Sequence, residues 1–291
     1  MYTHILSHRR GLYLKVSAVI GLLAIAVFIS QFYSGTRVEG STWQGYTLGI
    51  SAVVMVFFLG LLGWRKRQYQ SHLGSVQDWT SAHVYIGVLL LLVSTLHTGG
   101  QLGWNVHTAA YLFMLVVIVS GIVGIYFYFY FPRVASRNLA GHKRGEWMAE
   151  LNTLDDEAWQ LSGGCQPEVQ QIVRTAVQGS AYGGGIWAQL SGQDYSRLSS
   201  TEGGKSVSNS GQRLVIDYLA QRIPMATNDA EISALNTLLA VFGRRQTVLN
   251  TLRRDIQIQS LLKIWVYVHL PVTVSFLVLL FIHIATVLVY W

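Results

Sequence analysis

The sequence has very little cysteine and no recognisable nucleotide-binding motif. Its single cysteine, Cys165, rules out a disulfide within the chain and an iron–sulfur cluster held by the chain's own thiolates. The glycine runs at 183–185 and 203–204 match neither G-x-G-x-x-G between a strand and a helix nor a phosphate-binding loop. The sequence therefore predicts no flavin or nicotinamide site.

Charged residues are also scarce. They make up 12% of the chain, about half the share of a soluble domain, whereas 51% of the residues are hydrophobic. Five apolar runs are long enough to cross a bilayer, and lipid requires each to be a helix because it offers no partner for open backbone groups. The expected spans are 12–33, 46–64, 82–99, 109–131 and 264–290. We therefore expect an all-α membrane protein with five transmembrane helices.

The first apolar run follows His-Arg-Arg, as the apolar part of a signal peptide would. It is longer than the apolar core of such peptides, and no A-x-A cleavage site follows it. We therefore expect a retained transmembrane helix, which precedes the other four.

The net charge of +7 could indicate a nucleic-acid partner, but its distribution favours a membrane protein and no nucleic acid. Residues 132–262 are nearly neutral, with 13 Lys and Arg against 12 Asp and Glu. The excess lies beside the apolar runs, at Arg9, Arg10, Lys15, Arg65, Lys66, Arg67 and Lys263. By the positive-inside rule, the N-terminus, the 65–81 loop and residues 132–262 are cytoplasmic and the C-terminus lies outside.

The chain is predicted to divide into residues 1–131 with four membrane helices, an insert at 132–262, and residues 263–291 with the fifth. The insert begins at Pro132, and we expect helices over 146–161, 167–178 and 212–223. A longer helix should start near Asn228, since Asn228 and Glu231 match a capping box, and run toward the fifth span. We expect the insert to act in docking or bracing.

Four histidines lie at two equal spacings in the third and fifth spans. His83 and His97 are fourteen residues apart, as are His269 and His283. Fourteen helical residues are just under four turns, so each pair falls on nearly one helix face, about 21 Å apart along the axis. Ionisable residues within membrane spans are candidates for function.

Topology predicts how these histidines pair. The third and fifth spans cross in the same direction, so His83 and His269 should lie at the cytoplasmic side (the inner pair) and His97 and His283 at the opposite side (the outer pair). Two facing imidazoles can supply both axial ligands of a haem iron. Zinc or copper is the alternative metal, although no Cys, Asp or Glu joins the histidines within the spans.

The H-x13-H spacing on two parallel helices resembles the dihaem b-type cytochromes, whose four-helix bundle also occurs in quinol–cytochrome c reductases and, in similar form, in ferric reductases and NADPH oxidases. The resemblance covers 46–131 and 264–290. It implies two haem b groups, one on the inner pair and one on the outer pair. It also implies small residues where porphyrins pack, and four positions repeat the fourteen-residue spacing: Gly49, Gly63, Ala110 and Gly124.

The chain departs from the larger members of that family, because no further helices follow the fifth span and no flavin domain or quinol-oxidation motif is present. The closest resemblance is to stand-alone bacterial dihaem membrane subunits. It implies electron transfer across the bacterial inner membrane as one subunit of an oxidoreductase, with other redox subunits and a quinone as expected partners. A histidine-dependent proton or metal-ion transporter and a scaffold or assembly protein are the alternatives.

His107 opens the fourth span on the outer side, near Trp104 and Asn105. An aromatic belt of this kind marks the membrane interface. Contact with a haem propionate or with a quinone is one expectation for this residue.

Overall fold

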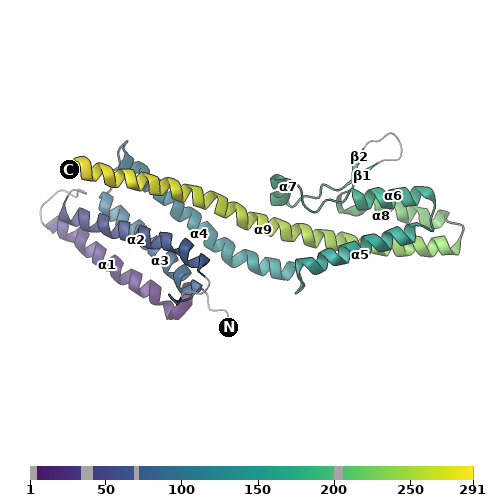
Figure 1. Cartoon of the computed structure of the whole chain (residues 1–291), viewed down its shortest axis with the longest axis horizontal. Helices are drawn as coiled ribbons and strands as arrows, with labels where there is room; N and C mark the ends of the chain where they lie inside the picture. Colours follow the sequence, from purple (N-terminus) through teal and green to yellow (C-terminus); the bar gives the residue numbers. More distant parts are fainter. Residues whose placement is uncertain (1–4, 34–41, 69–71, 200–205, 291) are drawn as a thin grey trace. The chain divides into compact units, whose positions relative to one another are not determined.

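The computed structural model describes residues 5–33, 42–68, 72–199 and 206–290, and it is mostly helical (Figure 1). The chain divides into two compact units. One unit comprises residues 1–124 together with 267–291, and the other comprises residues 125–266. The second unit corresponds to the expected insert and extends a few residues further at each end.

Among the residues that the structure describes, five helices are long and apolar enough to cross a membrane, as the sequence predicts. They are α1 (Leu12–Tyr33), α2 (Trp43–Arg67), α3 (Val76–Thr98), α4 (Val106–Asn138) and α9 (Asp229–Tyr290). A short 3-10 element, η1 (Ile5–Gly11), precedes α1. The molecule is thus a multi-pass helical membrane protein.

Two helix boundaries differ from those expected. Pro132 does not end the fourth helix, which continues to Asn138. Proline removes one backbone donor and favours a kink, but the helix on either side of it can persist. The fifth span is the C-terminal part of α9, which is one continuous helix from Asp229 onward. Asn228 caps it by accepting from the Ala230 amide at 3.0 Å, whereas the carboxylate of Glu231 accepts from the amide of Gln166.

Local sequence explains where α3 begins and ends. Ser75 and Asp78 form a capping box, in which each side chain accepts a hydrogen bond from the other's backbone N–H. Gly99 ends the helix in the left-handed conformation, which glycine adopts without a Cβ clash. Asp78 also accepts from His8 at 2.8 Å and from Tyr13 at 3.0 Å, so its buried carboxylate ties α3 to the chain before and within α1.

Helix α3 lies at the centre of the first unit and packs against both α1 and α2. The apolar core includes residues from all five membrane helices: Ala24, Leu48, Met55, Val56, Leu89, Leu90, Val93, Met114 and Phe276. Since α4 and α9 both contribute to this core, the two histidine-bearing helices α3 and α9 share one packed bundle.

The second unit is a small helical domain with its own core. Its helices are α5 (Arg144–Ser162), α6 (Pro167–Gln178), α7 (Ile186–Ser191) and α8 (Arg213–Arg222), with part of α9. Two short 3-10 elements, η2 (Ser210–Gln212) and η3 (Ile223–Met225), flank α8. The expected helices are found, whereas α7 and an antiparallel pair of strands, β1 (Arg197–Ser199) and β2 (Ser206–Ser208), were not anticipated.

Candidate histidine site in the membrane bundle

The structure brings the outer pair together. The rings of His97, near the end of α3, and His283, in α9, have centroids 6.2 Å apart and planes at 90°. Both rings are half-buried within the first unit. Two residues 186 positions apart in sequence are therefore neighbours in the bundle, although they belong to different helices.

This separation allows a metal-binding role for the outer pair. Bonds of about 2.0 Å from an ion to one nitrogen of each ring would set the ring centroids roughly 6.4 Å apart when the three atoms are in line. The observed 6.2 Å is close to this value. The donor set, two neutral imidazoles in an apolar bundle, also fits the axial positions of a haem iron.

His97 has a fixed tautomer. Its Nδ1 lies 2.8 Å from the backbone carbonyl of Gly45, and a carbonyl can only accept, so the ring carries its proton on Nδ1. The other nitrogen, Nε2, then has a free lone pair. Such a hydrogen bond on the far nitrogen is the usual way in which proteins orient a histidine ligand.

Gly49 permits the position of the His97 ring. A Cβ at this residue would lie 2.8 Å from Cε1 of His97, closer than a Cβ approaches another atom, and 3.2 Å from Nδ1 of the same ring. The glycine was expected to make room for a porphyrin, and in this structure the space is used by the ligand candidate itself.

The hydrogen bonds around His269 assign its tautomer as well. The Ser120 hydroxyl donates its only proton to the Val117 carbonyl at 2.8 Å. It can therefore only accept from Nδ1 of His269, which is 2.7 Å away. The proton of the His269 ring is therefore on Nδ1.

His83 differs from the other three. Its Nδ1 is buried and has no hydrogen-bond partner among the described residues, although the ring interacts with the backbone of Leu59. It is close enough to His269 for the charge of one ring to act on the other. Buried nitrogens in proteins almost always have a partner, so this orphaned atom is what a missing metal or haem bond would leave.

Besides the four candidate ligands, a further histidine, His107, lies at the outer pair. The ring of His107 contacts that of His283, with centroids 4.5 Å apart and planes at 88°, and the nearest atoms are the two Nδ1 nitrogens. The contact of His107 with a propionate or a quinone stays a prediction, and in the structure its ring lies against a candidate ligand, His283. Among the described residues, however, no group of three or more His, Cys, Asp or Glu side chains has the geometry of a metal site.

The other expected small residues vary in their surroundings. Gly63 has open space around it, whereas Ala110 and Gly124 are buried. Gly121, next to Ser120 in α4, also faces His269, because a Cβ there would lie 3.8 Å from Cε1 of that ring. Sequence reasoning missed Gly121, Ser120 and Gly45, whose roles depend on the packing of one helix against another.

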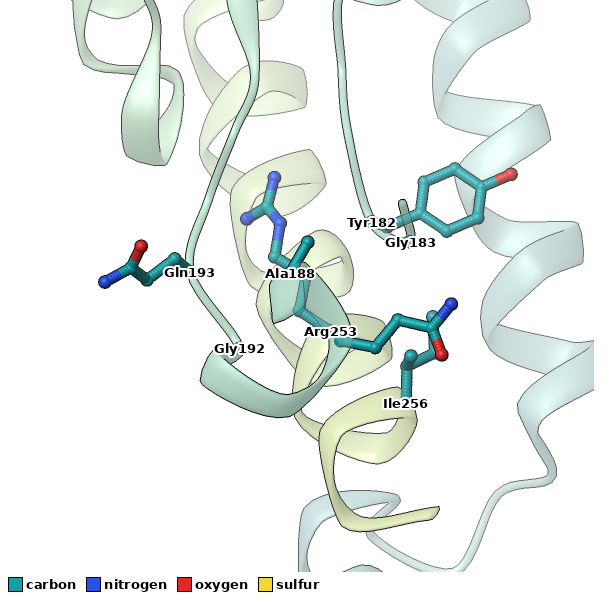
Figure 2. Close-up of a pocket in the computed structure, with 8 residues that line it drawn as sticks. Tyr182, Gly183, Ala188, Gly192, Gln193, Arg253 and Ile256 are labelled. Atoms are coloured by element: carbon teal, nitrogen blue, oxygen red, sulfur yellow. The ribbon is translucent and has the colours of Figure 1, made fainter. Parts of the chain in front are cut away.

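A second candidate lies in the other unit, where Figure 2 shows a small hollow beside Arg253. Its lining includes Tyr182, Gly183, Gln193 and Ile256, and the Tyr182 and Gln193 side chains point away from each other. Arg253 is engaged by protein groups: it donates to Ala181, Ser196 and Asn250 and pairs with Asp194 at 2.8 Å. With its guanidinium already satisfied, the hollow offers little to an anionic ligand.

The fold and the site define the protein as a multi-pass membrane protein with paired histidines in its bundle. The chain matches no known protein family, no curated protein and no solved structure.

Proposed function

We propose that this protein transfers electrons across a membrane through two b-type haems, held by His83 with His269 and by His97 with His283. The observation that carries the proposal is the short distance between the His97 and His283 rings, whose centroids are 6.2 Å apart. Each of these two histidines also lies fourteen residues after a histidine of the inner pair. Each bound haem would supply a one-electron carrier with both axial positions filled.

The chain's own residues prepare the ligands. Gly45 and Ser120 accept the Nδ1 protons of His97 and His269, and these hydrogen bonds orient both rings. The apolar side chains of the bundle core exclude water from the space between the helices. Burial and hydrogen bonding of this kind tune a redox potential, so the two sites, with different partners, should differ in potential.

The proposal includes an orientation and partners. Basic residues at the ends of the spans favour a cytoplasmic location for the N-terminus and for residues 132–262, in a bacterial inner membrane. With two histidines holding each haem, the group would supply electron transfer and no substrate chemistry. The protein would therefore act as one subunit of an oxidoreductase, passing electrons between a quinone or a soluble carrier and partner redox proteins.

The haem content of the purified full-length chain tests the proposal. Two haem b per chain and a sharp low-spin α-band in the reduced-minus-oxidised spectrum are expected. A colourless protein with no haem would reject the proposal and favour the histidine-dependent transporter, in which the same rings relay protons or bind a metal ion.

A further inference from the structure

The haem proposal leaves His107 without a role, yet local hydrogen bonds fix the start of the helix that carries it. It is the second residue of α4, and the amide of Thr108 donates to the side chain of Asn105 at 2.9 Å. The hydroxyl of Thr108 in turn accepts from the amide of Gly103 at 3.0 Å. The turn before α4 is thus fixed by local bonds, and it sets where the His107 ring can lie.

His107 is too close to His283 to share a metal ion with it through the nitrogens in contact. An ion between two imidazole nitrogens needs about 4 Å between them, twice a bond of roughly 2.0 Å. The Nδ1 atoms of His107 and His283 are in direct contact instead. The 6.2 Å between the centroids of His97 and His283 does leave that room, so His107 is a neighbour of the ligand pair.

The proposed ligation by His283 decides which ring donates in this contact. Two Nδ1 atoms form a hydrogen bond only when one carries a proton and the other a lone pair. If His283 binds iron through Nε2, its neutral ring carries the proton on Nδ1 and is the donor. His107 then accepts on Nδ1 and carries its own proton on Nε2. His283 would then donate from Nδ1, as His97 donates to Gly45 and His269 donates to Ser120.

We propose that His107 is a positioning residue that accepts the Nδ1 proton of His283 and thereby lowers the midpoint potential of the outer haem. The inference rests on the proposed function. An imidazole nitrogen is a stronger base than a backbone carbonyl or a hydroxyl, so it draws more of the proton away and makes His283 a more electron-rich ligand. A more basic ligand stabilises the oxidised iron.

The test compares His107→Leu and His107→Gln in the full-length, haem-loaded chain by potentiometric titration of the α-band. Leucine cannot accept a hydrogen bond, whereas the side-chain oxygen of glutamine can. In the leucine variant, we expect the midpoint potential of the outer haem to rise by about 59 mV. For one electron, this shift is an increase of about tenfold in the ratio of reduced to oxidised haem at a given potential. The glutamine variant should lie nearer the unmodified protein, and the inner potential should not change in either.

Three results would overturn the inference. The first is an outer potential that is unchanged in the leucine variant. The second is an equal shift in both variants, which would indicate a steric effect. The third is loss of the low-spin outer signal in His107→Leu together with its retention in His97→Leu, which would make His107 an axial ligand. If the His107→Leu variant releases the outer haem, the His107→Gln variant decides the question. Retention of the outer haem in that variant supports the role of His107, and its release rejects that role. Failure of the haem proposal itself would appear earlier, as an unmodified protein without haem.

Discussion

The hydroxyl of Ser120 accepts a hydrogen bond from Nδ1 of His269 at 2.7 Å, because its own proton is donated to the carbonyl of Val117. This relationship links two helices, α4 and α9, and sets the tautomer of a ligand candidate in the middle of an apolar bundle.

Ser120→Ala should weaken binding at the inner pair. Without the acceptor, the His269 ring loses its orientation, and the loss of such a partner typically reduces metal affinity by about 10- to 100-fold. Haem retention and the low-spin signal, measured in the purified protein, should fall for the inner component alone. Ser275→Ala is the matched control, because that hydroxyl donates only to the nearby Pro271 carbonyl in the same helix. Equal losses in both variants would contradict the role of Ser120.

Gly49→Ala should disturb the outer pair. The added Cβ would lie 2.8 Å from the His97 ring, which must move and lose its geometry with Gly45. A reduced-minus-oxidised spectrum should show a weakened outer component with the inner one preserved. Gly60→Ala on the same helix is the control, since a Cβ there meets no atom within 4 Å. An unchanged spectrum in Gly49→Ala would show that the close approach is unimportant.

Gly179→Ala should destabilise the second unit. A Cβ at this position would meet the Arg197 carbonyl oxygen at 1.9 Å, and the amide of Arg197 donates to the Gly179 carbonyl at 2.9 Å. Backbone must shift and that bond is strained, at a cost of roughly 3 kcal/mol in the free energy of unfolding. Thermal unfolding followed by limited proteolysis measures the loss. Gly183→Ala, with open space around it, should behave as the unmodified protein.

Labelling of introduced cysteines with a membrane-impermeant maleimide tests the orientation. Cys165 gives little background, because it is buried and burial raises the pKa of its thiol, with a further contribution from Glu231, so little thiolate forms at neutral pH. Leu102→Cys should be labelled in intact spheroplasts, and Asp156→Cys only after permeabilisation. Both positions are exposed in the structure. The reverse pattern would invert the proposed topology.

The spans and the expected helices of the insert could be predicted because their signals are local: apolar length for α1 to α4 and cap residues for the start of α9. The approach of His97 to His283 could also be predicted from the sequence, because the equal spacing and the number of spans put both residues at the same expected depth in the membrane. The partners Gly45, Ser120 and His107 could not be predicted. Each reaches its histidine from another helix, and nothing in the chain near His97, His269 or His283 marks that contact.

The extent of α4 and the strand pair were missed for related reasons. Pro132 is a local signal for a helix end, but α4 continues through it to Asn138. Strands β1 and β2 have three residues each, too few for an alternating pattern to appear in the sequence. Their pairing joins Leu198 to Val207, and residues 200–205 between the strands lie outside those described.

The central claim is that His97 and His283 hold one haem while His83 and His269 hold the other. Its most direct test is the reduced-minus-oxidised spectrum of the full-length protein with each histidine replaced in turn by leucine, which keeps bulk but cannot bind iron. The account predicts that His97→Leu and His283→Leu lose the same low-spin component, and that His83→Leu and His269→Leu lose the other. Full low-spin haem in all four variants would contradict it.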